Sequence, residues 1–309
     1  MPESAAEFAD LQDGSIVTLG AFDGVHCGHQ QILKRVLERA DATGLPAVAM
    51  TFRPHPLAVV KPEAAPLLLT PGDEQLVALA GYGIERTVLL EFTPALAELD
   101  ARAFVEQVLI GRCRMRELVI GYNHKLGRGR QGDAATLSQM GTALGFAVHV
   151  VPATVAADGT VVSSTAIRSV VEAGDMARAA RLLGRAYAVR GHVVSGHQRG
   201  RLIGYPTMNV VPDDASKLLP PDGVYAVRAT TPAGEFGGMM NVGGRPTFGE
   251  LERTVEVHLF DSEGAPYGAG VSVSVIHRLR NVMRFAGPDA LVAQLAKDAQ
   301  AARLALTQA

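Results

Sequence analysis

The stretch that decides the fold is LGAFDGVHCGH, residues 19–29. The apolar segment at residues 15–19 leads into it and predicts a short buried strand. Residues 30–43 follow and predict an amphipathic helix, because apolar side chains recur at helical spacing at Ile32, Leu33, Val36 and Leu37. Gly24 and Gly28 let the backbone between strand and helix approach a ligand closely. A glycine-rich turn at the start of a helix favours a bound phosphate group.

The same turn carries two histidines, His26 and His29, on either side of a glycine. Both imidazoles could donate hydrogen bonds to the negative charge that develops on a phosphoryl oxygen during displacement. The alternative is a plain strand–helix turn with two solvated histidines, since short motifs often occur by chance. A zinc site has less support, because no third ligand follows at a suitable spacing.

Working outward, the first half of the chain alternates between strands and helices. Further strands are expected at residues 46–52, 87–92, 118–121 and 146–151. Helices are expected at residues 70–80, with Thr70 as cap and Pro71 in first position, and at 132–144. This order predicts a parallel sheet with crossover helices.

The pattern changes after about Gly184. Two short helices are expected before this point, at residues 163–174 and 175–183. Short strands with Gly and Pro between them follow at 188–194, 223–229, 238–242, 254–260 and 271–276, and a helix at 288–306 ends the chain. Repeated short strands predict an antiparallel barrel or sandwich. In one of them Val255 and Val257 alternate with Glu256 and His258, which places the two pairs on opposite faces.

Length and composition agree with two globular domains, with a boundary at 184–187. The chain has 309 residues, 48% of them hydrophobic, and 29 basic against 31 acidic side chains, a net charge of −2. That balance argues against nucleic-acid and anionic-membrane partners. No apolar run reaches the length of a membrane span, and the first residues do not resemble a signal peptide. With only Cys27 and Cys113, a cytoplasmic protein is expected.

Three more segments of the first half carry polar or basic side chains at the ends of predicted strands: TFRPHP at residues 51–56, GRGRQGD at 127–133 and VSSTAIR at 162–168. Taken singly they read as a rigid loop, a solvated turn and a helix cap. Taken together they lie where open α/β sheets bind ligands. With residues 19–29 they resemble the nucleotidyltransferase superfamily, and in particular the FMN adenylyltransferase module of bacterial FAD synthetases.

That resemblance implies roles for individual residues. His26 and His29 would stabilise the pentavalent phosphorus while the FMN phosphate displaces diphosphate from ATP. The resemblance implies nucleotide-binding roles for Gly20, Phe22, Asp23, Gly24, Gly28, Ser163, Ser164, Thr165 and Arg168. It implies flavin-binding roles for Phe52, His55, Asn123 and Arg130.

The second half has its own motifs, GRLIGYPTMN at residues 200–209, PDGVYA at 221–226, NVGGRPTF at 241–248 and TVEVH at 254–258. By themselves they read as hairpin turns, with Glu256 as an outward-facing strand residue; the functional alternative is a phosphate loop and a carboxylate base. Their order resembles the riboflavin kinase module, which implies a small antiparallel β-barrel. The two modules in this order resemble the bacterial bifunctional riboflavin kinase/FAD synthetase family, with residues 1–185 as a Rossmann-like adenylyltransferase domain and 186–309 as the kinase barrel with its terminal helix.

For the kinase half the resemblance implies that Thr207 and Asn209 hold Mg²⁺ and the ATP phosphates. Glu256 would accept the proton of the ribityl 5′-hydroxyl. Gly196, Gly200 and Arg201 would belong to the loop over the phosphates, and Arg278 and Arg280 to a flap near the flavin. The implied ligands are riboflavin, FMN, ATP and Mg²⁺, and neither the sequence nor the resemblance fixes the oligomeric state.

One stretch departs from the family pattern. His124 and Leu126 stand where two aromatic residues are common. Loss of an aromatic face weakens stacking, which bears on FMN affinity or nucleotide choice. Rival interpretations are a protein with only one active module, one with altered nucleotide specificity, an adenylyltransferase for another substrate such as pantetheine phosphate, and a non-catalytic flavin sensor.

Overall fold

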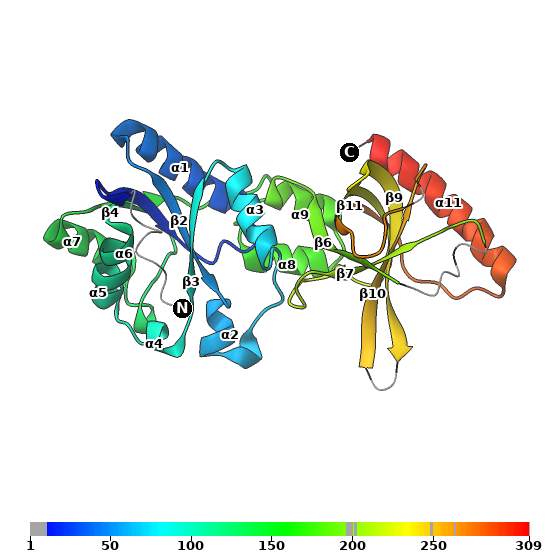
Figure 1. Ribbon diagram of the computed structural model, residues 1–309, viewed down its shortest axis with the longest axis horizontal. Coiled ribbons are helices and arrows are strands. Elements are labelled where there is room, and N and C mark those ends of the chain that lie inside the picture. The colour runs from blue at the N-terminus through cyan, green and yellow to red at the C-terminus, as the bar shows by residue number, and fades with distance from the viewer. Residues whose placement is uncertain (1–10, 196–199, 201–202, 248–249, 263, 309) are drawn as a thin grey trace. The chain divides into compact units, whose positions relative to one another are not determined.

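The computed structural model describes residues 11–195, 200, 203–247, 250–262 and 264–308 (Figure 1). It divides the chain into two compact units, Met1–Ser163 and Ser164–Ala309. The first unit contains β1 (Ser15–Leu19), α1 (Cys27–Thr43), β2 (Ala47–Arg53), α2 (Pro56–Val60), α3 (Asp73–Gly81), β3 (Arg86–Glu91), α4 (Pro94–Ala97), α5 (Ala101–Phe104), a π-helical segment (Val105–Ile110), α6 (Gly111–Cys113), β4 (Met115–Gly121), α7 (Ala134–Leu144) and β5 (Ala147–Val151).

The five strands of the first unit form one parallel sheet in the order β3-β2-β1-β4-β5. The chain starts in the middle of the sheet and moves outward first to one side and then to the other. The point where this direction reverses lies between β1 and β4, and open α/β sheets bind ligands beyond the strand ends at such a point. The prediction of a parallel sheet with crossover helices is confirmed.

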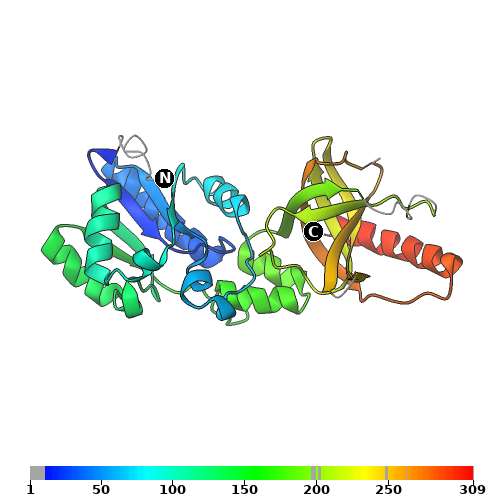
Figure 2. The ribbon, with the colours of Figure 1, turned by 60° about the horizontal axis from the view of Figure 1, so that its bottom comes forward.

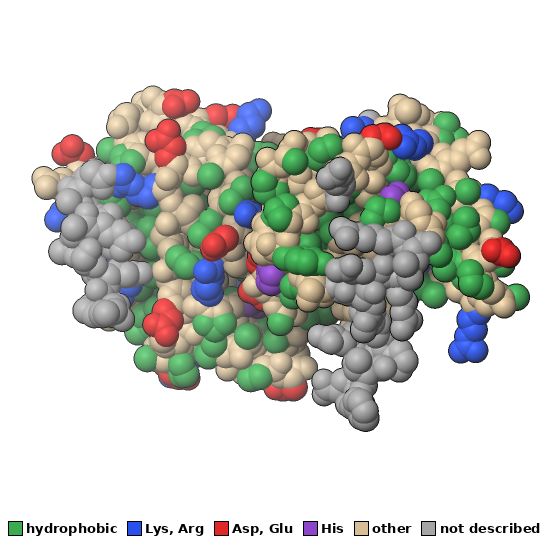
Figure 3. Space-filling model, turned by 45° about the vertical axis from the view of Figure 1, so that its right-hand side comes forward, with side chains coloured by type: hydrophobic (Ala, Val, Ile, Leu, Met, Phe, Trp, Pro, Cys, Tyr) green, Lys and Arg blue, Asp and Glu red, His purple; other side chains and the backbone are tan. Residues whose placement is uncertain are grey.

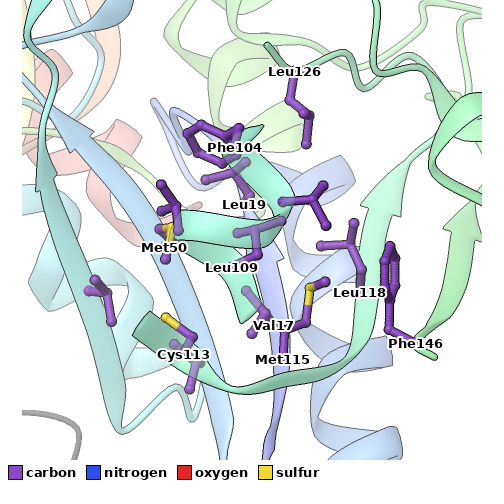
Figure 4. Close-up of a cluster of buried hydrophobic side chains, with 14 of the residues drawn as sticks. Val17, Leu19, Met50, Phe104, Leu109, Cys113, Met115, Leu118, Leu126 and Phe146 are labelled. Atoms are coloured by element: carbon purple, nitrogen blue, oxygen red, sulfur yellow. The ribbon is translucent and has the colours of Figure 1, made fainter. Parts of the chain in front are cut away.

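Apolar side chains cover both faces of this sheet. On one face, Leu33 and Val36 of α1 and Leu79 of α3 pack on Ile16 and Val119. The opposite face carries the larger cluster, in which α5, the π-helical segment and α7 cover β1, β2 and β4 (Figure 4); its labelled members are Val17, Leu19, Met50, Phe104, Leu109, Cys113, Met115, Leu118, Leu126 and Phe146. The unit is therefore a three-layer helix–sheet–helix structure.

Thr70 does not cap the helix expected at residues 70–80. That helix, α3, begins at Asp73 with Gly72 as its cap. The Thr70 hydroxyl instead accepts a hydrogen bond of 2.7 Å from the backbone N–H of Gly24, 46 residues earlier. The predicted cap and the predicted first position of Pro71 are therefore both wrong: the helix has no side-chain cap among the described residues, and a long-range contact takes up the Thr70 hydroxyl.

The second unit begins with two helices, α8 (Ser164–Glu172) and α9 (Met176–Leu183). Its strands are β6 (Tyr187–Val194), β7 (Met208–Pro212), β8 (Gly223–Thr231), β9 (Gly234–Thr247), β10 (Glu250–Leu259) and β11 (Gly270–Arg280), and α11 (Pro288–Thr307) follows. The strands close into an antiparallel barrel in the order β10-β7-β6-β11-β8-β9, which decides between the two expected architectures (Figure 2).

The barrel interior is filled by alternate residues of its strands, among them Val189, Tyr225, Met240, Val255 and Val273, all nearly inaccessible to solvent. The helix α11 packs across β8, β9 and β11. Its apolar contacts join Ala302 to Ala226, Met239 and Phe260 on the outside of the barrel. On the face shown in Figure 3, side chains of both charge signs are scattered among apolar ones.

No helix in the described ranges is long and apolar enough to cross a membrane. Among the described residues, no group of three or more His, Cys, Asp or Glu side chains is placed to hold a metal ion.

Candidate active sites

The turn between β1 and α1 has a constrained backbone. Phe22 and Val25 have positive φ values of 44° and 38°, and both side chains are buried. Only glycine adopts this region freely, so these two residues are held there by their surroundings. The backbone N–H of Gly20 donates to the Met50 carbonyl, and that of Gly24 donates to Thr70. The turn is thus fixed from both ends before helix α1 begins.

Asp23 secures the same turn from within. Its Oδ1 accepts hydrogen bonds from the backbone N–H groups of Leu69, at 2.8 Å, and Thr70, at 3.0 Å. The side chain is 3% exposed. Asp23 and Phe22 therefore shape the phosphate turn, and their predicted direct contact with a nucleotide stays a prediction.

His26 and His29 are brought together as the sequence predicted. His26 is the N-cap of α1, and its Nδ1 accepts the backbone N–H of His29 at 3.2 Å. The two rings stack with centroids 3.7 Å apart and planes inclined by 15°. Gly28 makes this stack feasible, because a Cβ at that position would lie 3.2 Å from the His26 ring.

His29 is a neutral imidazole in this setting. Burial, followed by the neighbouring His26, lowers its pKa well below 6.5. Its Nδ1 is buried and makes no hydrogen bond within the described part of the chain. A neutral imidazole at the positive end of a helix can donate one hydrogen bond to a phosphoryl oxygen.

The end of β2 carries Phe52 and His55. Phe52 is half-buried and meets Phe92, which follows β3, edge to face with ring centroids 5.2 Å apart. The peptide between Arg53 and Pro54 is cis. His55 caps α2 and accepts the backbone N–H of Leu57 at 3.2 Å. Both predicted flavin-binding residues therefore lie at the carboxyl end of β2, at the same sheet edge as the histidine turn.

The end of β4 carries Asn123, His124 and the basic loop. Asn123 and Arg130 are exposed, and Arg130 has a positive φ of 58°. Burial, and secondarily the charge of Arg130, lowers the pKa of His124 to about 4. Its Nε2 is buried without a hydrogen-bond partner among the described residues. His124 is thus a second neutral imidazole at this edge.

Leu126, the other departure from the family pattern, has a different environment. It is 7% exposed and belongs to the core cluster beside Phe104 (Figure 4). Its backbone pairs with Gly132 to close the basic loop. The loss of an aromatic residue here therefore changes core packing, whereas the change at His124 introduces a polar group.

The hydroxyl-rich segment divides between the two units. Val162 is buried, and its carbonyl oxygen lies beside Gly28 in the first unit. The segment that leads to Ser163 therefore passes close to the histidine turn. Ser164, Thr165 and Arg168 are in the first two turns of α8, which opens the second unit. Their predicted participation with the histidines in one site stays a prediction.

In the second unit, three polar residues stand in a row across the barrel strands. Glu256 on β10 pairs directly with Asn209 on β7 and with Asn241 on β9. Their strand neighbours Val255, Val257, Met240 and Val242 are buried inside the barrel. The three polar side chains therefore share the outer face and are partly exposed. The outward position predicted for Glu256 is confirmed.

Sequence reasoning had identified Glu256 and Asn209 but passed over Asn241 as a functional residue. The signal was present, because the alternation used for residues 254–259 also holds along β9: Met240 and Val242 point inward and Asn241 points outward. Neighbouring outward residues of two paired strands lie on one face.

Thr207 and Gly200 adjoin this row. Thr207 is half-exposed and immediately precedes β7. The backbone N–H of Tyr205 donates to the Gly200 carbonyl, and a Cβ on Gly200 would collide with the Tyr205 carbonyl oxygen. Only glycine fits this tight turn. The predicted loop residues Gly196 and Arg201 lie outside the described residues.

Arg278 and Arg280 are engaged with the protein itself. Arg278 donates to the Asp222 carbonyl at 2.8 Å, beside Gly174 and Gly223. Arg280 forms a bidentate ion pair with the buried carboxylate of Asp298 on α11, with distances of 2.9 and 2.7 Å. These contacts attach the segment before β8 and the helix α11 to β11. The predicted flavin contacts of both arginines stay predictions.

Comparisons with known proteins agree with this architecture. Residues 9–166 match the family model described as FAD synthetase, and residues 183–306 match that described as riboflavin kinase. The bifunctional riboflavin kinase/FMN adenylyltransferase of Escherichia coli K12 is 36% identical over 94% of this chain and 93% of its own length. The protein of the same name from Bacillus subtilis 168 is 34% identical over 94% and 92%.

A solved structure is similar over nearly its whole length. It is a crystal structure from Streptococcus pneumoniae described as a macrolide-efflux protein, with a TM-score of 0.86, 34% identity and 94% of each chain covered. The two family models cover the two halves of the chain in the same order as the two sets of motifs. The chain belongs to the bifunctional riboflavin kinase/FMN adenylyltransferase family.

Proposed function

We propose that this protein makes FAD in two steps. The second unit transfers the γ-phosphoryl group of ATP to the 5′-hydroxyl of riboflavin and gives FMN and ADP. The first unit then joins FMN to the adenylyl group of another ATP and releases diphosphate. Both activities are those named for relatives that cover more than nine-tenths of this chain.

The kinase step is supported by the pairing of Glu256 with Asn209 across β10 and β7. The ribityl hydroxyl oxygen attacks the γ-phosphorus, the bond from that phosphorus to the bridging oxygen breaks, and ADP leaves. Glu256 accepts the proton of the hydroxyl as the new bond forms. Most of the remaining rate enhancement comes from positioning and charge neutralisation.

The residues beside Glu256 fit a magnesium ion. The Thr207 hydroxyl and the Asn209 amide oxygen are hard oxygen donors, both partly exposed, and Asn209 is directly opposite a carboxylate. When bound with ATP, Mg²⁺ supplies neutralisation of the phosphate charge. Thr207 and Asn209 then orient the phosphates relative to the hydroxyl.

The adenylyl-transfer step is supported by the stacked His26–His29 pair at the start of α1. A phosphate oxygen of FMN attacks the α-phosphorus of ATP, and the bond from that phosphorus to the oxygen bridging to the β-phosphate breaks. The imidazole N–H groups and the helix N-terminus stabilise the charge on the equatorial oxygens. No covalent intermediate with the protein forms. Ser164, Thr165 and Arg168 are proposed to hold the leaving diphosphate.

The proposal includes the boundary at 185/186 between the two catalytic modules, which agrees with the start of the riboflavin kinase match at residue 183. It also includes a cytoplasmic location. Cys27 and Cys113 form no disulfide in the described part of the chain, which is compatible with a reducing compartment.

The test is chromatography of flavins after the purified protein has been mixed with riboflavin, ATP and MgCl₂. We expect FMN first and FAD afterwards. Glu256→Gln should lower FMN formation by about 10²-fold or more while FMN supplied directly is still converted to FAD. Accumulation of FMN without FAD would refute adenylyl transfer from ATP, and other nucleoside triphosphates would then be tried. Riboflavin bound but left unconverted would favour the flavin-sensor alternative.

A further inference from the structure

Asn241 occupies the position opposite Glu256 on the side away from Asn209. In the antiparallel pair of β9 and β10, Glu256 is matched with Asn241, and in the pair of β10 and β7 it is matched with Asn209. Directly opposed residues of adjacent strands have Cβ atoms about 4.5–5.5 Å apart, within reach of an amide and a carboxylate. Glu256 therefore stands between two amides on one face of the sheet.

The Asn241 amide lies beside a glycine of its own strand. Gly243 is two residues further along the same face, and a Cβ built there would be in ordinary van der Waals contact with Asn241 Nδ2, at 3.6 Å. The inward neighbours Met240 and Val242 are completely buried, which fixes the backbone beneath Asn241. Asn241 is thus a polar side chain on a rigid strand, and such strands hold functional groups more accurately than loops do.

The two amides are not equivalent. Asn209 follows Pro206 and Thr207 and belongs to the segment proposed to meet the nucleotide phosphates. Asn241 is on the far side of Glu256 from that segment, because β10 lies between β7 and β9 in the barrel. On β10, the residue directly opposite Asn241 is Glu256, whose carboxylate is within reach of the amide.

We propose that Asn241 is a positioning residue for Glu256: its amide N–H donates a hydrogen bond to the carboxylate in the substrate complex and aims that carboxylate at the 5′-hydroxyl. The inference rests on the proposed role of Glu256 as the proton acceptor. A hydrogen bond from the amide restricts the flexible Glu256 side chain to one orientation.

Other polar residues on the same outer face could also influence the orientation of the Glu256 carboxylate. On β10 itself the same face carries Thr254 and His258; on β7 it carries Asn209, and Thr207 immediately precedes that strand. His258 is the titratable group among these four. Its Nδ1 is 2.7 Å from the Pro206 carbonyl oxygen and its ring meets Tyr205 edge to face, so it is held away from Asn241 by contacts of its own.

The experiment compares Asn241→Ala, Asn241→Asp and the control Thr254→Ala in the full chain, with separate assays of FMN formation and of FAD formation from added FMN. Thr254 is on the same face as Glu256, and its hydroxyl donates to the Gly243 carbonyl at 3.2 Å. Thr254→Ala thus disturbs the same strand pair without touching the proposed contact. Riboflavin binding by fluorescence and melting by circular dichroism check folding of the barrel.

Asn241→Ala should lower kcat for FMN formation by about 10- to 100-fold, with KM for riboflavin and ATP changed less than about threefold. Asn241→Asp keeps the size of the side chain but removes the N–H donor opposite Glu256. It should therefore lower kcat at least as much as Asn241→Ala does, again with KM changed less than about threefold. Thr254→Ala should keep kcat within about threefold of the parent, and all three should form FAD from FMN at the parent rate.

Parent kcat in Asn241→Ala or Asn241→Asp, or a loss confined to KM, would overturn the inference. An equal loss of kcat in Thr254→Ala would do the same. If Asn241→Ala fails to fold, kcat and KM of Asn241→Asp, which is close in size to the parent residue, decide the question alone. Failure of the parent protein to phosphorylate riboflavin is a separate outcome that refutes the proposed function itself.

Discussion

The imidazole of His29 lies face to face with that of His26, with ring centroids 3.7 Å apart. Two imidazolium ions would repel each other strongly at this distance, and His29 is also buried. The pair therefore works with His29 uncharged near neutral pH. The pair can donate hydrogen bonds to a phosphoryl group while His29 adds no positive charge to the turn.

Replacement of His29 should separate the two activities. We expect His29→Asn to lower the rate of FAD formation from FMN by about 10²- to 10³-fold, because a hydrogen bond to the developing charge is lost. FMN formation by the same molecules should keep its parent rate. The matched control is His149→Asn, which removes a histidine of the same unit that bonds Glu117 at 2.7 Å. Equal loss of FAD formation in both variants would contradict the role of His29.

His124 should make the first unit sensitive to acid. The unfolded chain binds the proton with a pKa near 6.5, whereas the folded protein binds it near 4. His124 therefore does not reduce the free energy of unfolding above about pH 6.5, and it reduces it progressively as the pH falls toward 4. At pH 5 the reduction due to this residue is about 2 kcal/mol. Burial of His29 acts in the same direction.

The measurement is urea denaturation of the parent and of His124→Phe at pH 7.5, 6 and 5. Circular dichroism is the suitable signal, since the chain has no Trp. The variant should lose about 2 kcal/mol less than the parent between pH 7.5 and 5 in the unfolding transition of the first unit. Parallel stability curves for the two proteins would show that the neutral state of His124 contributes nothing.

Removal of the Asp298 carboxylate should weaken the attachment of α11. Asp298 accepts three hydrogen bonds from Arg280 and one from Gln294, and the ion-pair side chains are 17% and 4% exposed. Asp298→Ala leaves a largely buried guanidinium unpaired and should cost about 3 kcal/mol. Asp213→Ala, which removes an exposed partner of His192, should cost less than about 1 kcal/mol. Thermal unfolding of both variants provides the comparison.

The double variant Arg280→Leu/Asp298→Leu should regain much of that loss, because no charge is left buried. It also tests the flavin-binding role predicted for Arg280. If the double variant binds riboflavin with the affinity of the parent, Arg280 serves the attachment of α11 alone.

Two glycines of the basic loop should respond differently to alanine. Gly127 and Gly129 have similar φ values of 75° and 65°. A Cβ on Gly127 would lie 2.5 Å from the backbone nitrogen of Ala101, whereas one on Gly129 would meet only the Gln131 side chain at 3.8 Å. Gly129→Ala should cost about 1 kcal/mol from backbone strain alone. Gly127→Ala should cost at least about 2 kcal/mol more and lower FAD formation, because the loop that carries Arg130 must move. Equal melting temperatures would contradict this contact.

Patterns local in sequence predicted much of the fold. The strand expected at residues 15–19 is β1 with the same bounds, because its five residues are apolar or small, fully buried and followed by a glycine turn. The alternation around Glu256 likewise placed this residue correctly on the outside of the barrel.

Features that depend on distant partners could not be predicted from the sequence. Residues 206–209 read as a turn because of Pro206 and Asn209, whereas residues from Met208 onward form the strand β7 (Met208–Pro212), since β6 and β10 flank it. Thr70 has the propensity of a cap, yet its hydroxyl serves the histidine turn. Nothing near Arg280 indicated that Asp298, on a separate helix, would take up its guanidinium.

The helix pair α8–α9 determines where the chain can be cut to give a separate kinase fragment. The two family models stop at residue 166 and resume at 183, so most of this pair is outside both. In the structure α9 packs on β6 and β11, and Ala179, Leu182 and Leu183 are buried. A kinase fragment cut at residue 186 would lose both helices and expose apolar strand surface to water, whereas a fragment cut just before residue 164 would keep that surface covered. The fragment that keeps the barrel strands covered therefore begins at the entrance to α8, and it takes with it Ser164, Thr165 and Arg168, which are proposed to serve the other reaction.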